Sequence, residues 1–358
     1  LCGDTPLLKA ETLRDMYEFH KSKNNHATVL TAVFENPYNY GRIIRNTGGD
    51  IIDIVEERDA DSKQKEILEI NSGIYLFEGN LLKKFLRQLN NDNDQGEYYL
   101  TDVIKIFNEN NLKTGAFLIK DSNEIMGVNN RLQLYQAESL MRKKINEEHM
   151  LKGVTIVDPL NTYIDYMVKI DRDVTILPGC TIKGNTYIEE DAEIGPYSQI
   201  IDSHIGKGVS IRNSLVIESR IGEGTCIGPF AYLRPGNVVG KNAKIGDFVE
   251  MKNSNFGDNS KASHLTYIGD GDVGKNVNIG CGVVFVNYDG KEKHRTVVED
   301  HSFIGCNTNL IAPVKVGKNS YIAAGTTITK DVPEANLAVG RAKQENKEGW
   351  VKRKGLLK

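Results

Sequence analysis

Residues 170–200 read IDRDVTILPGCTIKGNTYIEEDAEIGPYSQI, with an isoleucine at every sixth position from Ile170 to Ile200. This spacing matches neither the period of an α-helix nor the alternation of a single β-strand. A period of six is typical of a parallel β-helix, in which each hexad supplies one short strand and a turn and three hexads complete a coil. The isoleucines then point inward and stack on their counterparts one coil away. An ordinary β-sandwich with regularly spaced turns is the alternative.

The same period continues almost to the end of the chain. After Ile200 the count slips by one residue, gives a series that ends at Ile217, and resumes at Ile221. Glycine often follows the aliphatic residue, as in IGKGVS and IGEGTC, because it tolerates the backbone angles and the close approach of a turn. The stretch FVNYDGKEKHR at 285–295 interrupts the repeat and is longer than a turn requires. Such ejected loops are commonly functional.

The chain before the repeat follows other patterns. Residues 11–20 have the spacing of an amphipathic helix, residues 27–34 read as a buried strand, and further short strands and helices alternate after them. This alternation favours an α/β layer fold. Residues 131–152 contain no Gly or Pro and are rich in helix formers, so we expect a connecting helix there. The predicted organisation is an α/β domain at 1–130, this helical linker, and a β-helix with a C-terminal tail at 153–358.

Composition excludes several classes of protein. The 45 Lys and Arg residues against 48 Asp and Glu give a net charge of −3, which provides no basic balance for binding nucleic acid. No apolar run approaches the ~18 residues needed to span a membrane. The five cysteines are an odd number without a CxxC pair, which fits a reducing cytoplasm better than a disulfide framework or a zinc site. We therefore expect a cytoplasmic protein whose partners are small molecules.

His264 is the first candidate for a catalytic residue. It occupies a non-aliphatic position of its hexad, so its side chain should lie at the surface, where a lone histidine is more often functionally neutral. Lys252 and Arg234 fall on nearby coils, and both suit an anionic substrate. Histidine is the natural general base for an amine nucleophile, so this set is compatible with acyl transfer. The neutral side chains that could orient a sugar are those of Asn278, Asn287 and Tyr288.

A second candidate site lies at the start of the chain. Asp4 follows the apolar residue and glycine of LCGD, at what reads as the end of a buried strand. An aspartate in this position can hold Mg²⁺ beside phosphates. The alternative is that Asp4 caps the following helix or turn. Because the chain opens without an initiator Met, we expect it to be a fragment.

Longer motifs in both halves carry a resemblance to a known family. In chain order the α/β half contains GDTPLL, NPYNYGRI, IVEERDA, EINSGIY, NNDNDQGEYYLTD and GVNNRLQL. The repeat contains AYLRPG, GDFVEMKNS, KASHLTYIGD, NVNIGCG, VNYDG, IAPVKVG, YIAAGTT and KEGW. Together they resemble the bacterial bifunctional N-acetylglucosamine-1-phosphate uridyltransferase and glucosamine-1-phosphate acetyltransferase family. The resemblance implies an incomplete nucleotidyltransferase-type (Rossmann-like) α/β domain followed by a left-handed β-helix.

By this resemblance, the C-terminal half transfers acetyl from the co-substrate acetyl-CoA to the amine of glucosamine 1-phosphate. His264 matches the general base, and Arg234 with Lys252 matches the residues that hold the sugar phosphate. Tyr267 and Asn278 match sugar contacts. The positions that match the acetyl-CoA site are Cys281, Asn287, Tyr288, Cys306, Ala324 and Arg341. In the family this site is shared between chains, so the resemblance also implies a homotrimer.

The N-terminal half, by the same resemblance, transfers uridylyl from UTP to N-acetylglucosamine 1-phosphate and so makes UDP-N-acetylglucosamine for the cell envelope. Asp4 and Asn129 match ligands of Mg²⁺, which would neutralise phosphate charge. The positions that match nucleotide-sugar contacts are Cys2, Gly3, Asp4, Gly41, Glu56, Asn71 and Asn129.

Some features depart from the family pattern. The family's Gly-rich phosphate loop would lie before Leu1, so we expect this chain to transfer uridylyl poorly or not at all. Cys2 replaces an aromatic residue often found beside Gly-Asp. Cys281 and Cys306 stand where Ala or Ser is common, and we expect both to be tolerated. Two rival hypotheses are a sugar-1-phosphate pyrophosphorylase with a regulatory β-helix and a non-catalytic β-helix scaffold, neither of which needs the HLTY and VNYDG motifs.

Overall fold

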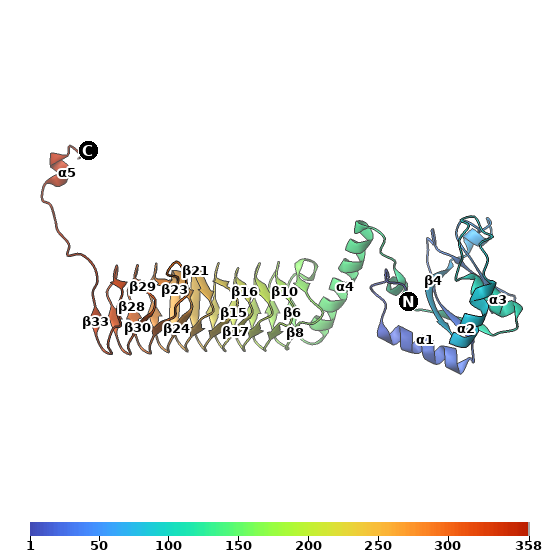
Figure 1. Cartoon of the computed structure of the whole chain (residues 1–358), viewed down its shortest axis with the longest axis horizontal. Helices are drawn as coiled ribbons and strands as arrows, with labels where there is room; N and C mark the ends of the chain where they lie inside the picture. Colours follow the sequence, from blue (N-terminus) through green and yellow to red (C-terminus); the bar gives the residue numbers. More distant parts are fainter. Residues whose placement is uncertain (357–358) are drawn as a thin grey trace. The chain divides into compact units, whose positions relative to one another are not determined.

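The computed structural model describes residues 1–356 and divides the chain into two compact units, Leu1–Met141 and Arg142–Lys358 (Figure 1). The first unit is a mixed α/β layer, and the second is a long stack of short parallel strands. No helix within residues 1–356 has both the length and the apolar character that a membrane crossing requires.

The first unit is built on a five-stranded sheet with the order β3-β2-β4-β1-β5, in which only β1 and β5 run parallel. Its elements are α1 (Ala10–Ser22), β1 (Ala27–Val33), β2 (Arg42–Arg45), β3 (Ile51–Val55), η1 (Gln64–Glu66), β4 (Glu69–Phe77), α2 (Gly79–Phe85), η2 (Leu86–Gln88), α3 (Asp102–Glu109), β5 (Thr114–Leu118) and η3 (Ser122–Ile125). Helix α4 (Arg131–Leu151) follows.

Strand β1 is apolar along most of its length because both faces of the sheet are covered. Val29 packs with Phe107 of α3 in one core cluster. Leu30, its neighbour in sequence, packs with Met16 of α1 in the other. Successive side chains of a strand point to opposite faces, so a central strand between two helical layers lacks the polar alternation of a surface strand.

The second unit is the parallel β-helix that the six-residue period predicts. One ladder joins β8 (Lys169–Ile170), β11 (Tyr187–Ile188), β14 (His204–Ile205), β17 (Ser219–Ile221), β20 (Asn237–Val239), β22 (Asn255–Phe256), β24 (Gly271–Val273), β27 (Thr296–Val298) and β30 (Val314–Val316).

The other two faces form one continuous sheet. Its strands are β6 (Thr155–Ile156), β7 (Tyr163–Ile164), β9 (Thr175–Ile176), β10 (Thr181–Lys183), β12 (Glu193–Ile194), β13 (Gln199–Ile201), β15 (Ser210–Ile211), β16 (Leu215–Ile217), β18 (Cys226–Ile227), β19 (Tyr232–Leu233), β21 (Lys244–Lys252), β23 (Lys261–Gly269), β25 (Asn278–Ile279), β26 (Val284–Val286), β28 (Phe303–Ile304), β29 (Asn309–Ile311), β31 (Tyr321–Ile322), β32 (Thr327–Ile328) and β33 (Leu337–Ala338). The short helices η4 (Pro159–Asn161) and α5 (Trp350–Arg353) lie outside these sheets.

The predicted inward side chains form the core, with one correction. Ile182 pairs with Ile200 across neighbouring coils, and both are fully buried. The slip after Ile200 is confirmed, because Ile205 pairs with Ile188 and is fully buried. The next slip was placed wrongly: Val216 pairs with Ile200 and is fully buried, whereas Ile217 is only half-buried. The corner between Ile211 and Val216 is one residue shorter than usual, so the inward position comes five residues after Ile211.

The glycine that follows many core residues is required by close approach of the coils. A Cβ atom on Gly222 would lie 2.6 Å from the carbonyl carbon of Gly240 in the next coil. Real Cβ atoms essentially never come this close to another heavy atom. The hexad glycines thus let neighbouring coils stack at the spacing of a β-ladder.

Two strands of the β-helix are exceptional in length. β21 and β23 each have nine residues, where most other strands of this unit have two or three. They run around a corner and pair on both sides of it, with Asp247 opposite His264 and Met251 opposite Ile268. This corner carries the candidate catalytic residue.

Candidate active sites

The strand register places five residues in one column along a corner of the β-helix. β21 and β23 pair Asp247 with His264 directly. In each following coil the residues before and after the corner pair with the same spacing in sequence, so the corner residues between them also lie in register. In the first step Ala262 pairs with Ile279 and Tyr267 with Val284. In the next step Ile279 pairs with Ile304 and Val284 with Asn309. The final step pairs 304 with 322 and 309 with 327. The corner column therefore consists of Asp247, His264, Cys281, Cys306 and Ala324.

His264 is held by a carboxylate from the preceding coil. Its Nδ1 lies 2.5 Å from Oδ1 of Asp247, and their side chains are 59% and 37% exposed. This hydrogen bond keeps the pKa of Asp247 below its usual value. Sequence reasoning missed Asp247, although the match between GDFVEMK and SHLTYIG one coil later was a signal for the pair. A carboxylate that orients the imidazole in this way distinguishes His264 from a surface histidine without a function.

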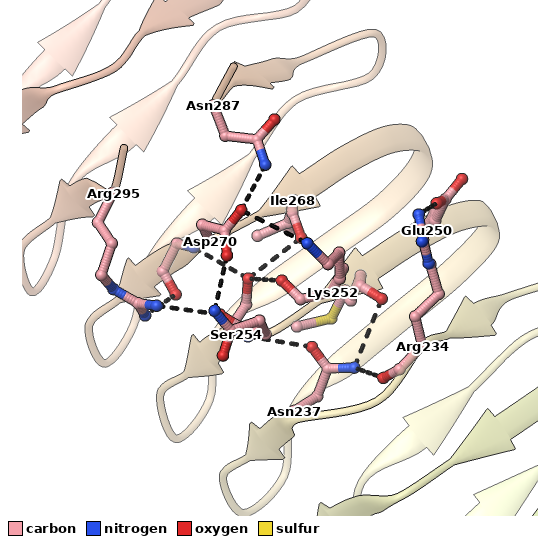
Figure 2. A network of polar contacts seen from close by, with 12 residues as sticks. Arg234, Asn237, Glu250, Lys252, Ser254, Ile268, Asp270, Asn287 and Arg295 are labelled. Carbon is pink, nitrogen blue, oxygen red and sulfur yellow. Dashed lines mark hydrogen bonds and ion pairs between the residues drawn. The ribbon is translucent and has the colours of Figure 1, made fainter. Parts of the chain in front are cut away.

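Three positively charged side chains lie on the coils near His264 and on the ejected loop. Nη1 of Arg234 lies 3.1 Å from Oε1 of Glu250, and Nζ of Lys252 lies 3.9 Å from Oδ2 of Asp270 (Figure 2). The ammonium of Lys293, from the ejected loop, lies against Lys252; this contact first, and then burial, lowers the pKa of Lys252. Each of two adjacent ammonium groups disfavours the charged form of the other, so an anion bound between them would stabilise both.

Asp270 is the hub that ties the ejected loop to the coils. Asp270 is only 5% exposed, and its carboxylate accepts a hydrogen bond from Nδ2 of Asn287 at 2.5 Å (Figure 2). It accepts another from Nδ2 of Asn253 at 2.6 Å. Burial alone would raise its pKa, but the two amide hydrogen bonds and Lys252 together hold the pKa below its usual value. Sequence reasoning placed Asn287 at the site but missed Asp270.

The loop itself is internally braced. The hydroxyl of Tyr288 donates to the carbonyl of Gly290 at 2.7 Å, and Asp289 Oδ2 lies 2.7 Å from Nε2 of His294. At the loop's end Arg295, also missed by sequence reasoning, donates from Nε and Nη2 to Asp272 at 2.9 and 2.6 Å. These contacts fix where the loop's side chains can reach.

The remaining candidates of this half are distributed around the column. Nη1 of Arg341 donates to the carbonyl of Ala324 at 2.6 Å, which places a guanidinium at the end of the column. The hydrogen bond to Glu250 raises the pKa of the Arg234 guanidinium, and burial opposes this rise. The nearby Tyr267 makes a smaller contribution in the same direction as Glu250. Asn278 is exposed on β25; among residues 1–356 its side chain makes no hydrogen bond to the other predicted sugar-binding residues.

In the first unit, Asp4 and Asn129 come together although 125 positions separate them. The Cβ position of Gly127 lies 3.5 Å from Oδ2 of Asp4 and 3.7 Å from Nδ2 of Asn129, and the N–H of Val128 donates to the carbonyl of Asp4 at 2.8 Å. Residues 1–356 contain no cluster of three or more His, Cys, Asp or Glu side chains that could hold a metal alone. The pair suits Mg²⁺, which is commonly held by one or two protein ligands plus substrate oxygens.

The predicted nucleotide-sugar contacts form a neighbouring cluster. The carboxylate of Glu56 lies 3.2 Å from the Cβ position of Gly41, whose carbonyl accepts the N–H of Asn71 at 2.8 Å. Burial raises the pKa of Glu56. Cys2 Sγ lies 3.4 Å from the carbonyl oxygen of Gly73 on the same strand as Asn71.

Gly3 and Tyr75 also belong to this cluster. The Cα of Gly3 faces open space, with no heavy atom within 4 Å of its Cβ position. The hydroxyl of Tyr75, which sequence reasoning missed, donates to Oδ1 of Asn71 at 2.9 Å and thereby orients that amide. An amide held in one orientation is suited to a hydrogen-bonding ligand.

Comparisons with known proteins agree with both halves. Residues 1–148 match the nucleotidyl transferase family model, and residues 295–330 match the model for the bacterial transferase hexapeptide (six repeats). The bifunctional protein GlmU of Clostridium botulinum (strain Kyoto / Type A2) is 54% identical over 356 residues, 99% of this chain and 78% of that protein. The bifunctional protein GlmU of Clostridioides difficile (strain 630) is 56% identical over 354 residues, 99% of this chain and 77% of that protein.

Among solved structures, a UDP-N-acetylglucosamine acyltransferase of Francisella novicida covers 56% of this chain and 74% of its own, with 21% identity and a TM-score of 0.34, too slight a likeness to support an argument. The sequence relatives, in contrast, run the length of both units. The chain therefore belongs to the family of bifunctional GlmU proteins, transferases of UDP-N-acetylglucosamine synthesis that join a nucleotidyltransferase domain to a parallel β-helix of hexapeptide repeats.

Proposed function

We propose that the β-helix of this chain transfers acetyl from acetyl-CoA to the amine of glucosamine 1-phosphate, with His264 as the general base. The observation that carries the proposal is the hydrogen bond between Asp247 and Nδ1 of His264. A carboxylate at Nδ1 keeps the proton on that nitrogen and leaves Nε2 as the acceptor. His264 is exposed, so Nε2 is available to a substrate.

The proposed step needs one proton acceptor. The amine nitrogen attacks the thioester carbonyl while Nε2 of His264 takes the proton that the nitrogen loses. Collapse of the tetrahedral intermediate breaks the carbon–sulfur bond and releases CoA, whose thiolate recovers the proton from the imidazolium. Asp247 stabilises the imidazolium while it exists.

Anchoring residues are proposed on both sides of the base. Arg234 and Lys252 bind the phosphate of the acceptor sugar, since they provide charge-assisted hydrogen bonds. Lys252 already has Lys293 against it, and the single carboxylate of Asp270, 3.9 Å from Nζ of Lys252, leaves a net positive charge that a phosphate would balance. Tyr267 and Asn278 are proposed to contact the sugar. The residues proposed to line the acetyl-CoA site are Cys281, Asn287, Tyr288, Cys306, Ala324 and Arg341.

For the first unit we propose the uridylyl site. Asp4 and Asn129 would hold a Mg²⁺ ion, which neutralises phosphate charge and orients the transferred group when bound. Cys2, Gly3, Gly41, Glu56 and Asn71 would contact the nucleotide sugar. Several expectations from the sequence stay predictions. They are the domain boundaries at residues 130 and 153, the weak uridylyl transfer of this chain, the left-handed winding of the β-helix, the homotrimer and the cytoplasmic location.

The test is acetyl transfer by the purified chain. Acetyl-CoA and glucosamine 1-phosphate are supplied, and formation of N-acetylglucosamine 1-phosphate is followed by mass spectrometry. We expect turnover that falls by about 10²–10⁴-fold in His264→Ala, the range attributed to a general base. His301→Asn is the matched control, because His301 is an exposed histidine at another corner with a left-handed φ of 58° that Asn tolerates. A folded chain without acetyl transfer would refute the assignment.

A further inference from the structure

Two cysteines stand next to each other in the corner column. The ladder pairs Ile279 with Ile304 before the corner and Val284 with Asn309 after it, so Cys281 and Cys306 occupy equivalent positions of neighbouring coils. We propose that they form a reversible dithiol–disulfide pair that controls the neighbouring acetyl-transfer site. The effect on activity rests on the proposed function, whereas formation of the bond does not.

The backbone brings the two residues into range. The N–H of Asn307 donates to the carbonyl of Cys281 at 2.7 Å, and the Cβ position of Gly280 lies 2.7 Å from the nitrogen of Cys306. Equivalent residues of neighbouring strands have Cα atoms about 4.8 Å apart, inside the ~4.4–6.8 Å window of disulfides. Both thiols are free, so the pair is available for oxidation.

The same geometry makes the bond reversible. Side chains at equivalent positions leave the ladder in similar directions, so the Cβ atoms should also lie about 4.8 Å apart, longer than the ~3.8 Å mean of disulfides. Closing the bond must therefore draw the two corners together by up to about 1 Å. Strained and exposed disulfides are the readily reduced, regulatory ones.

Register together with accessibility separates this pair from the other cysteines. Cys2 is exposed but belongs to the first unit. Cys306 is exposed and Cys281 is half-buried at its side. Cys180 is buried in the core, and the exposed Cys226 belongs to β18, three coils before β25, without a cysteine partner in register. Within the pair, Cys306 is thus the thiol that a reagent reaches first, and Cys281 is the thiol that resolves the product.

The chemistry is thiol–disulfide exchange with a low-molecular-weight disulfide. The thiolate of Cys306 attacks one sulfur of the reagent, the reagent's S–S bond breaks, and one reagent thiol leaves as a mixed disulfide forms. The thiolate of Cys281 then attacks Sγ of Cys306 and releases the second reagent thiol. The reagent is reduced to two thiols, the two cysteines are oxidised to one disulfide, and their two protons pass to the released thiolates.

The consequence for catalysis follows from the column. Cys281 is one coil from His264, and Cys306 is one coil from Ala324, whose carbonyl accepts a hydrogen bond from Arg341. The bond shifts the corners between the proposed base and the proposed acetyl-CoA contacts. A misplacement of about 1 Å in an active site can cost about 100-fold in rate.

The experiment treats the full chain with coenzyme A disulfide and uses two independent readouts. Tryptic mass spectrometry detects the cross-link, because cleavage at Lys and Arg puts Cys281 and Cys306 on different peptides. Acetyl transfer is measured before treatment, after treatment and after dithiothreitol. Cys306→Ala removes the attacking thiol, Cys281→Ala removes the resolving thiol, and Cys226→Ala is the matched control.

We expect an intramolecular Cys281–Cys306 cross-link, a fall in acetyl transfer of about 100-fold, and recovery with dithiothreitol. The activity of Cys306→Ala, whatever its untreated level, should not fall on treatment. Cys281→Ala should accumulate a mixed disulfide at position 306, and Cys226→Ala should respond to treatment like the unmodified chain. Absence of the cross-link peptide overturns the proposal whether or not the chain has acetyltransferase activity. A cross-linked protein of undiminished activity overturns the control of the site.

Discussion

The carboxylate of Asp247 and the imidazole of His264 are joined at 2.5 Å across two successive coils. Asp247→Asn should lower the rate of acetyl transfer. An amide that donates to Nδ1 of His264 moves the imidazole proton to Nε2, and Nε2 can then no longer accept a proton from the substrate. We expect kcat to fall by about 10²–10⁴-fold with KM values little changed. Asp247→Ala imposes no tautomer and should lose less.

The measurement is the steady-state rate of sugar acetylation for both variants. Asp258→Asn serves as the control, since Asp258 is also a coil carboxylate but pairs with Lys275 at 2.8 Å away from the column. Equal kcat in Asp247→Asn and the unmodified chain would show that Asp247 does not position the base.

Lys252 should affect binding more than turnover. Lys252→Met removes a charge-assisted hydrogen bond worth about 1.5–3 kcal/mol, so the KM for glucosamine 1-phosphate should rise by roughly 10–100-fold while the KM for acetyl-CoA stays close to normal. Titration of each substrate at saturating concentrations of the other separates the two effects. Lys241→Met, which breaks the exposed pair with Glu223, should change neither. A Lys252 variant with selectively raised KM for acetyl-CoA would contradict the proposed phosphate contact.

Asp270 should make the β-helix sensitive to acid. Its pKa is lower in the folded chain than in the unfolded chain, where it is about 3.9, so its ionised form contributes stability above that pH. The contribution is lost as pH falls through the lower, folded-state pKa. Urea unfolding of the β-helix between pH 6 and pH 2.5 should show a drop in the free energy of unfolding that Asp270→Asn reduces.

The donor side of this contact gives a separate prediction. Asn287→Ala leaves the buried carboxylate short of one hydrogen bond, so we expect a loss of about 1–3 kcal/mol in the free energy of unfolding at pH 7. Asn255→Ala is the control, because Asn255 donates to Asp272 at 2.7 Å in a more exposed place. Equal losses in the two variants would mean that Asp270 gains nothing particular from Asn287.

Asp4 should control metal-dependent binding in the first unit. Asp4→Ala removes a charged oxygen ligand, so the gain in affinity for UDP-N-acetylglucosamine on adding Mg²⁺ should largely disappear. Isothermal titration with and without Mg²⁺ measures this gain without requiring turnover. Asp121→Ala is the control: Asp121 pairs with Lys9 at 3.3 Å outside the cluster. An undiminished Mg²⁺ effect in Asp4→Ala would exclude Asp4 as a ligand.

The fold could be predicted because its signal is local. The six-residue spacing of the core residues can be counted in a single sequence and predicts the coils. Ile182 and Ile200 stack as this spacing predicts. The exception at Val216 arose from a corner shortened by one residue, which changes which of two adjacent aliphatic residues turns inward. Periodicity counts residues, whereas packing responds to the path of the backbone.

The active-site partners were harder to predict because they depend on coil length. Ile200 pairs with Val216, 16 residues on, whereas Phe285 pairs with Leu310, 25 residues on. Asp247 lies in a coil of 17 residues, like Met251 opposite Ile268, and so could have been placed beside His264 from the repeat. Cys306 could not be placed beside Cys281, because the ejected loop lies between them. Asp4 and Asn129 meet through the tertiary fold of the first unit, so no spacing rule predicts their contact; the family resemblance alone suggested it.

The ejected loop leaves its coil between two strands whose core residues still stack, Phe285 on Leu310 and Val273 on Val298. The stacking of the core therefore does not depend on how many residues the chain inserts between these two strands. The inserted residues bring Asn287 to Asp270 and Lys293 to Lys252, and the solenoid beneath them keeps its register. One coil of the β-helix thus gains a segment that contributes to the proposed site, and the core pairs on both sides of it stay in register.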